Sequence, residues 1–96
     1  MPRKYKTSKN FDRVLAKLQK KDKQLYENLL NKMNEILNIL DIEHYKNLHY
    51  DLKEYKRVHV GHFVLVFKYD KPNDLIFLDD FDHVKNLQFL STIRNY

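Results

Sequence analysis

The segment 63–69, FVLVFKY, constrains the fold more than any other part of the sequence. Its residues are nearly all β-branched or aromatic, which is typical of a strand that is covered on both faces. Such a strand needs a partner strand on each side and apolar side chains packed against it. We therefore predict that residues 63–69 form the central strand of a sheet.

Turn signals lie on both sides of this segment. Gly61 and His62 predict a two-residue hairpin, and a glycine at its first position suits a type II′ turn. Before it, Tyr55–Val60 alternates, so that Tyr55, Arg57 and His59 are expected on one face and Lys56, Val58 and Val60 on the other. After it, the sequence DKPND predicts the next turn. Residues 75–78, LIFL, are then expected as the third strand of a meander that ends at DDFDH, residues 79–83.

The first 40 residues show helical periodicity instead. Ser8 and Asp22 are suitable N-caps for two consecutive helices, and helices joined so tightly must form an antiparallel hairpin. Apolar residues recur at helical spacing and are predicted to enter the core. They are Phe11, Val14, Leu15 and Leu18 in the first helix, and Leu25, Leu29, Met33, Ile36, Leu37 and Leu40 in the second.

The remaining segments complete a two-layer arrangement. Residues 5–8 are expected as a short edge strand, residues 41–54 as a loop or turn, and residues 84–96 as either a short strand or a helical turn. Helices followed by a meander define an α+β domain with the helical hairpin on one sheet face. A chain of 96 residues is the size of one domain, so we predict a single domain over residues 1–96, whose other sheet face is left for function.

Charge and composition exclude several classes of function. No apolar run is long enough to cross a bilayer, and the N-terminus has no signal-peptide core, so a cytoplasmic protein without membrane contact is expected. The absence of cysteine excludes thiolate catalysis and disulfides. Residues 1–23 contain nine basic and two acidic residues, a balance that favours a polyanionic partner. A lysine-rich, solvated helix face explains the same charge equally well.

Arg57 and His59 are the candidate chemical groups. On one strand they share a face, about 6.6 Å apart. An arginine can hold a phosphate through two parallel hydrogen bonds, and a histidine can donate or accept a proton near neutral pH. Together they could cleave RNA through its own 2′-hydroxyl, although Arg and His on an exposed strand are more often ordinary surface residues.

Metal and nucleotide sites are less well supported. His59 and His62 form a two-histidine pair, but no third ligand is evident near them. The acidic sequence at residues 79–83 lacks the glycine and the closing glutamate of a calcium loop, so solvated acids at a strand end are the better interpretation. With Gly61 as the only glycine, a phosphate-binding loop is excluded. We expect no metal and no cofactor.

The middle of the chain resembles a known family. YKNLHYDLKEYKRVHVGHFVLVFKYD is similar to the central part of RelE-type toxins of type II toxin–antitoxin systems, especially archaeal members. The pattern comprises a Leu-Lys pair, an aromatic residue, basic residues, Val-x-Val-Gly and a Val/Leu-rich strand. It is matched here by Leu52, Lys53, Tyr55, Arg57, Val58, Val60, Gly61, Val64 and Leu65. IFLDDFDH resembles the next strand of the family and its ending.

The resemblance implies a ribosome-dependent mRNA endoribonuclease that is neutralised by a RelB-like antitoxin and meets operator DNA only through the antitoxin complex. Arg57 would stabilise the scissile phosphate, and His59 or His83 would move protons. Lys53, Lys56 and Lys85 would hold the RNA backbone.

Some family positions differ in this chain. Val64 stands where many members have an arginine, Gln88 or Phe89 where a tyrosine is frequent, and Tyr96 is a distant substitute. Weak nuclease activity is therefore expected, and the alternative is a non-catalytic RelE-fold protein that binds antitoxin and acts only within a DNA-binding autoregulatory complex.

Overall fold

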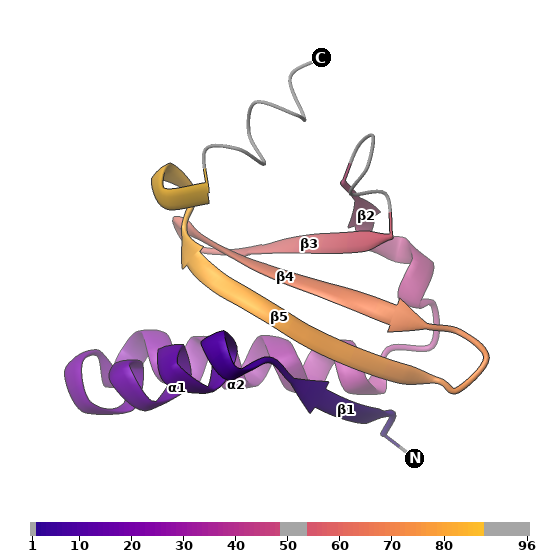
Figure 1. Ribbon diagram of the computed structural model, residues 1–96, viewed down its shortest axis with the longest axis horizontal. Helices are drawn as coiled ribbons and strands as arrows, with labels where there is room; N and C mark the ends of the chain where they lie inside the picture. Colours follow the sequence, from indigo (N-terminus) through magenta and orange to yellow (C-terminus); the bar gives the residue numbers. More distant parts are fainter. Residues whose placement is uncertain (1, 49–53, 88–96) are drawn as a thin grey trace.

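The computed structural model describes residues 2–48 and 54–87. Two helices lie side by side against one face of a five-stranded sheet (Figure 1). The elements in chain order are β1 (Lys4–Thr7), α1 (Lys9–Lys21), α2 (Lys23–Asn38), η1 (Ile42–His44), β2 (Lys46–Asn47), β3 (Tyr55–Val60), β4 (Phe63–Asp70), β5 (Leu75–His83) and η3 (Val84–Leu87). The predicted α+β two-layer architecture is confirmed.

The strand order in the sheet is β1-β5-β4-β3-β2, which places β4 at the centre as predicted. Strands β3, β4 and β5 form the expected antiparallel meander. The N-terminal strand β1 pairs with β5 in parallel, so the sheet as a whole is mixed. Among the described residues, the first strand and the last strand are therefore neighbours.

Both predicted N-caps are present. The Phe11 N–H donates to Ser8 Oγ at 2.9 Å, and the Leu25 N–H donates to Asp22 Oδ1 at 3.1 Å. Such bonds satisfy backbone donors that have no partner inside the helix. A single residue thus separates α1 from α2.

The apolar stripes of the two helices enter the main core, with one exception. Phe11, Leu29, Met33 and Ile36 are buried, and Val14, Leu15, Leu18, Leu25 and Leu37 are packed against them. Leu40 was predicted to belong to this stripe, but its side chain is 98% exposed. Because α2 ends at Asn38, the helical period no longer applies to Leu40.

The β3–β4 hairpin has the predicted two-residue turn. Val60 pairs with Phe63, and Gly61 has a φ of 62°. His62 does not share this positive φ, as expected for the second position of a type II′ turn. Glycine is favoured at the first position because it adopts positive φ without a steric penalty.

Strand β5 is longer than predicted. The sequence DDFDH, expected to end the strand at residue 78, continues it to His83. Val66 pairs with Asp80 and Phe67 with Leu78, which leaves Asp79 as an extra residue in a β-bulge. The bulge shifts the alternation by one, so that Phe81 as well as Ile76 and Leu78 points into the main core. Burial, with the neighbouring charge of Asp80, raises the pKa of the Asp79 carboxyl.

The segment expected to be a loop between α2 and β3 contains two short elements. The turn η1 and strand β2 lie in it, and β2 pairs with β3. Tyr45 between them anchors this segment, because its hydroxyl donates to Glu35 on α2 and its ring packs edge-on against Phe67. Residues 84–87 form a 3₁₀ turn, one of the two predicted alternatives. None of the described helices is long and apolar enough to cross a lipid bilayer.

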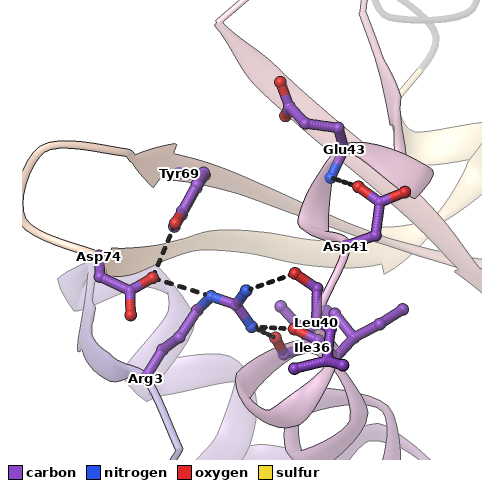
Figure 2. A network of polar contacts seen from close by, with 8 residues as sticks. Arg3, Ile36, Leu40, Asp41, Glu43, Tyr69 and Asp74 are labelled. Carbon is purple, nitrogen blue, oxygen red and sulfur yellow. Dashed lines mark hydrogen bonds and ion pairs between the residues drawn. The ribbon is translucent and has the colours of Figure 1, made fainter.

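Arg3 joins the N-terminus to the end of α2 (Figure 2). Its guanidinium donates to the carbonyls of Ile36 and Leu40, both at 3.3 Å, and also to the carbonyl of Ile39. Its Nε donates to Asp74 Oδ1 at 3.0 Å, and the same oxygen accepts from the Tyr69 hydroxyl at 2.7 Å. The last carbonyls of a helix have no hydrogen-bond donor within the helix, so they need a partner from elsewhere. Arg3 therefore has a structural role within the basic N-terminal segment.

Candidate nucleic-acid interface

The sheet face turned away from α1 and α2 is called here the outer face. Val64 and Val66 of β4 are buried on it and form a second apolar cluster with Leu48, packed by Tyr55 and Val84. Leu65 and Phe67, which alternate with them, point into the main core beneath the helices. The outer face thus has an apolar centre, and polar side chains occupy the strands on both sides of it.

Arg57 and His59 lie on this outer face, as predicted. Their strand neighbours across the β3–β4 pair are Val66 and Val64, both members of the outer cluster. Arg57 Nη1 lies 3.5 Å from His59 Nε2, at the outer limit of a hydrogen bond. A guanidinium and an imidazole are thus held next to one another on a rigid strand, with His59 more exposed than Arg57.

Lys46 is a basic residue of this face that the sequence analysis missed. It pairs directly with Arg57 across the β2–β3 ladder, so the two side chains share a face, and Lys46 is exposed. Strand β2 has only two residues, which is too short for a periodic signal. The only available signal was the charge of Lys46 itself.

Lys56 was predicted to hold the RNA backbone, and its position contradicts this role. It is 5% exposed and points away from the outer face. Its ammonium contacts Glu43 at 2.8 Å, Asn47 Oδ1 at 2.7 Å and the Tyr45 carbonyl at 3.3 Å. Three partners satisfy the three donors of an ammonium group. Lys56 links β3 to η1 and to β2, and its ammonium is not available to a polyanion.

His83 is on the opposite side of the sheet from Arg57 and His59. It pairs with Phe63, which packs against the main core, and its ring meets the Phe63 ring edge-on at 5.4 Å. The His62 ring is stacked on it at 6.2 Å. His83 also lines a cleft of about 340 Å³ together with Lys17 and Lys21 of α1. The three predicted catalytic residues are therefore not brought together.

The two remaining predicted RNA contacts differ in what can be described. Lys85 is exposed in η3, and its backbone N–H donates to His83 Nδ1 at 3.1 Å. Lys85 therefore lies next to His83 and not next to Arg57. Lys53 lies outside the described residues, as do Gln88, Phe89 and Tyr96.

Two acidic residues of β5 follow its bulge and extend from the sheet edge toward α1, since Asp80 contacts Asn10 and Asp82 lines the same cleft as Lys17. Asp80 pairs with Val66 and Asp82 with Val64, each two strands away from Arg57 and His59 respectively. Asp80 accepts from the Asn10 side chain at 2.7 Å, and Asp82 accepts from the Asn86 side chain at 3.0 Å. Within residues 2–48 and 54–87, no three histidine or acidic side chains are grouped as a metal site.

Sequence comparison identifies the family. No family model matches the chain. A protein of Methanocaldococcus jannaschii named "Putative toxin RelE4" is 43% identical over 79 residues, which cover 81% of this chain and 82% of that protein. An uncharacterized protein of Methanosarcina mazei is 40% identical over 79 residues, covering 81% of this chain and 90% of its own. The chain belongs to the RelE toxin family.

Solved structures agree on the fold. The toxin–antitoxin complex RelBE2 of Mycobacterium tuberculosis contains a chain that matches with a TM-score of 0.71 at 15% identity, covering 86% of this chain and 92% of that one. The archaeal RelE–RelB complex of Pyrococcus horikoshii contains one with a TM-score of 0.64 at 15% identity, covering 86% and 96%. Both likenesses support the RelE fold predicted from the sequence.

Proposed function

We propose that this protein is the toxin of a type II toxin–antitoxin system and acts as a ribosome-dependent mRNA endoribonuclease in the cytoplasm. The single observation that supports the activity most directly is the placement of Arg57 beside His59 on the outer face. Family membership supports the choice of substrate, because the relative at 43% identity is named as a RelE toxin.

The proposed reaction uses the RNA's own nucleophile. His59 takes the proton of a 2′-hydroxyl, whose oxygen attacks the adjacent phosphorus while the bond to the 5′-oxygen breaks. The leaving oxygen takes a proton from water, the resulting hydroxide takes the proton that His59 had gained, and the products have a 2′,3′-cyclic phosphate and a 5′-hydroxyl. Arg57 donates two hydrogen bonds to the non-bridging oxygens, where charge increases in the transition state.

Neighbouring lysines would contact the phosphates of the RNA backbone. Lys46 lies directly beside Arg57 and is exposed, so it is the first candidate. Lys53 remains a candidate from the family resemblance, and Lys85 could contact RNA at the η3 end of the sheet. His83 is not assigned a proton-transfer role here, because it lies on the other side of the sheet from His59.

The activity is tested by cleavage of mRNA on purified ribosomes. Arg57→Ala is expected to lower cleavage at least 100-fold while the protein stays folded, because Arg57 lies on the outer face and not in the main core. Arg57→Lys keeps the charge but loses the two-pronged donor and should recover only a small part of the activity. Cleavage unchanged in Arg57→Ala would remove this residue from the site.

An antitoxin partner is the second part of the proposal. Two of the solved structures that match the fold are toxin–antitoxin complexes, and α1 presents Lys20 and Lys21 in its last turn, followed by Lys23. An acidic RelB-like chain could wrap this surface, with operator DNA bound only through that complex. Changing these three lysines to glutamine should slow association with the product of the neighbouring gene at low salt. If the association rate depends neither on the salt concentration nor on these lysines, the interface lies elsewhere.

A non-catalytic antitoxin-binding protein is the alternative. It is favoured by the separation of His83 from Arg57 and His59, which leaves one histidine on the proposed catalytic face of the described residues. Expression of the protein alone discriminates the two, since only the nuclease would arrest translation.

A further inference from the structure

Four residues form a continuous row across the outer face of the sheet. Lys6 of β1 pairs with Phe77 of β5, Phe77 pairs with Lys68 of β4, and Lys68 pairs with Tyr55 of β3. Residues paired directly across strands project from the same face. We call these four residues the cation–aromatic row. It alternates lysine and aromatic side chains across four of the five strands.

Within the row, the Lys68 ammonium lies between the two aromatic rings. Lys68 Nζ lies 4.8 Å from the centre of the Tyr55 ring and 5.7 Å from that of the Phe77 ring. Both rings are half-buried, so each is supported by the sheet while part of it reaches the surface. The Phe77 end borders a shallow depression of about 400 Å³, also lined by Lys68 and Leu75.

The row begins beside the proposed cleavage site. Tyr55 and Arg57 are two residues apart on β3, so their side chains share the outer face at about 6.6 Å. From Tyr55 the row leads across β4 and β5 to Lys6, which is exposed at the edge strand. Exposed Lys4 lies next to it and pairs with Leu75. A strand of nucleic acid held at Arg57 can therefore continue along the row.

We propose that the cation–aromatic row is a binding platform for the single-stranded RNA that flanks the cleavage site. Bases would stack on Phe77 and Tyr55, because every base presents a π-face, and Lys6 and Lys68 would contact phosphates. The choice of RNA rests on the proposed function. The platform itself rests on the alternation of rings and cations, which an apolar protein partner would not require.

Two acidic side chains compete with RNA at this surface. Glu54 lies 3.7 Å from Lys68 Nζ, and Asp70 lines the depression. The Glu54 side chain is 68% exposed, and such ion pairs contribute little in water, so a phosphate can displace it. Glu54→Gln is therefore expected to strengthen RNA binding, a change in the opposite direction from the other variants.

The test is fluorescence anisotropy with a labelled ten-nucleotide uridine RNA, in the absence of ribosomes. Phe77→Leu keeps an apolar side chain but removes the ring, and we expect binding to weaken about tenfold. Tyr5→Leu is the matched control, because Tyr5 is 52% exposed on the same edge but pairs with Ile76, whose side chain faces the main core. It should change binding less than twofold.

Charge and stacking are separated by two further measurements. Lys6→Gln should reduce the slope of log Kd against log salt by about 0.7, the amount for one phosphate contact in a single strand. An abasic oligonucleotide of the same length should bind the wild type more weakly than the uridine RNA does. It should bind Phe77→Leu and the wild type with equal affinity, because it has no bases to stack on the ring. Thermal unfolding of each variant identifies any loss of fold.

Several results would overturn the platform. One is failure of the folded wild type to bind RNA, and another is an equal effect of Phe77→Leu and Tyr5→Leu on RNA binding. A third is a Phe77→Leu variant that binds RNA as well as the wild type does but binds an antitoxin peptide more weakly. Ribosomal cleavage measured on the same preparations keeps this test distinct from that of the nuclease. Cleavage with no Phe77-dependent RNA affinity rejects only the platform, whereas Phe77-dependent affinity without cleavage rejects only the nuclease.

Discussion

Lys56 Nζ lies 2.8 Å from a carboxylate oxygen of Glu43, and the lysine side chain is 6% exposed while that of the glutamate is 65% exposed. A buried ammonium is thus paired with an acid that remains in water. The hydrogen bond from Lys56, with its positive charge, lowers the pKa of the Glu43 carboxyl. The pair links η1 to β3, beneath the strand that presents Arg57.

This pair should make stability depend on pH. A carboxyl whose folded pKa is depressed stabilises the fold above its unfolded pKa, and this contribution is lost as the pH falls through the folded pKa. Glu43→Gln is expected to be less stable than the wild type at pH 7, and the difference should shrink as the pH falls below 4.5, the ordinary pKa of a glutamate carboxyl. Urea unfolding at pH 7 and pH 3.5 measures both. Glu27→Gln, on the exposed surface of α2, is the control.

Replacing Lys56 tests whether this residue acts on the stability of the fold or on RNA binding. Lys56→Met fills the same space and leaves no buried charge unpaired, because the Glu43 side chain is 65% exposed, but it removes the bonds to Asn47 and the Tyr45 carbonyl and should be moderately destabilising. Lys56→Ala leaves a cavity and should cost about 2 kcal/mol or more. Neither should change the affinity of the folded protein for RNA, which anisotropy can measure. A large loss of RNA affinity in well-folded Lys56→Met would contradict the buried position.

Arg3 should be important for stability although it lies next to the N-terminus. Arg3→Ala removes bonds to carbonyls at and just after the end of α2 and to Asp74, and hydrogen bonds to a charged group contribute about 1.5–3 kcal/mol. Arg3→Lys should recover little, since an ammonium cannot reproduce the planar fork of donors. Lys4→Ala, at an exposed neighbouring position, is expected to stay within about 0.5 kcal/mol of the wild type in urea unfolding.

Gly61 offers a test of backbone conformation free of packing effects. An added Cβ would meet nothing within 4 Å, so only its φ of +62° opposes a side chain. Gly61→Ala is expected to destabilise the fold by about 1–2 kcal/mol. Gly61→Asn should cost less, because asparagine tolerates positive φ better. Equal stability of all three proteins would mean that the turn changes conformation at no cost.

Amide hydrogen exchange should rank the strands. Strand β4 has a partner on each side, whereas β1 and β2 lie at the sheet edges, so protection should be greatest at residues 63–69. Protection confined to α1 and α2 would contradict this order.

The sequence predicted those features that local physics determines. The helix caps at Ser8 and Asp22, the central strand and the turn at Gly61 follow from residue type and spacing, and all are present. The length of β5 did not follow, because an inserted residue at Asp79 interrupts the alternation that would have revealed residues 80–83.

The site was predicted less completely because it depends on tertiary contacts. Arg57 and His59 share a face by strand alternation alone, and this was predictable. Alternation placed Lys56 on the face of Val58 and Val60, opposite Arg57, but its burial also requires Glu43 and Asn47 to fold over it, which the alternation does not indicate. The place of His83 depends on the bulge, which reverses the face that simple counting from residue 78 would assign.

The pairing of β1 with β5 has a consequence for how the protein is made. Ser8 donates through its backbone N–H to the Leu78 carbonyl and through its hydroxyl to that of Asp79, and Arg3 reaches Asp74. Contacts so distant in sequence close late and slow folding. A nascent chain cannot complete this edge of the sheet until the strand that ends at His83 has left the ribosome. The finished fold, and any activity that depends on it, must therefore follow synthesis of every residue from β1 to the end of β5.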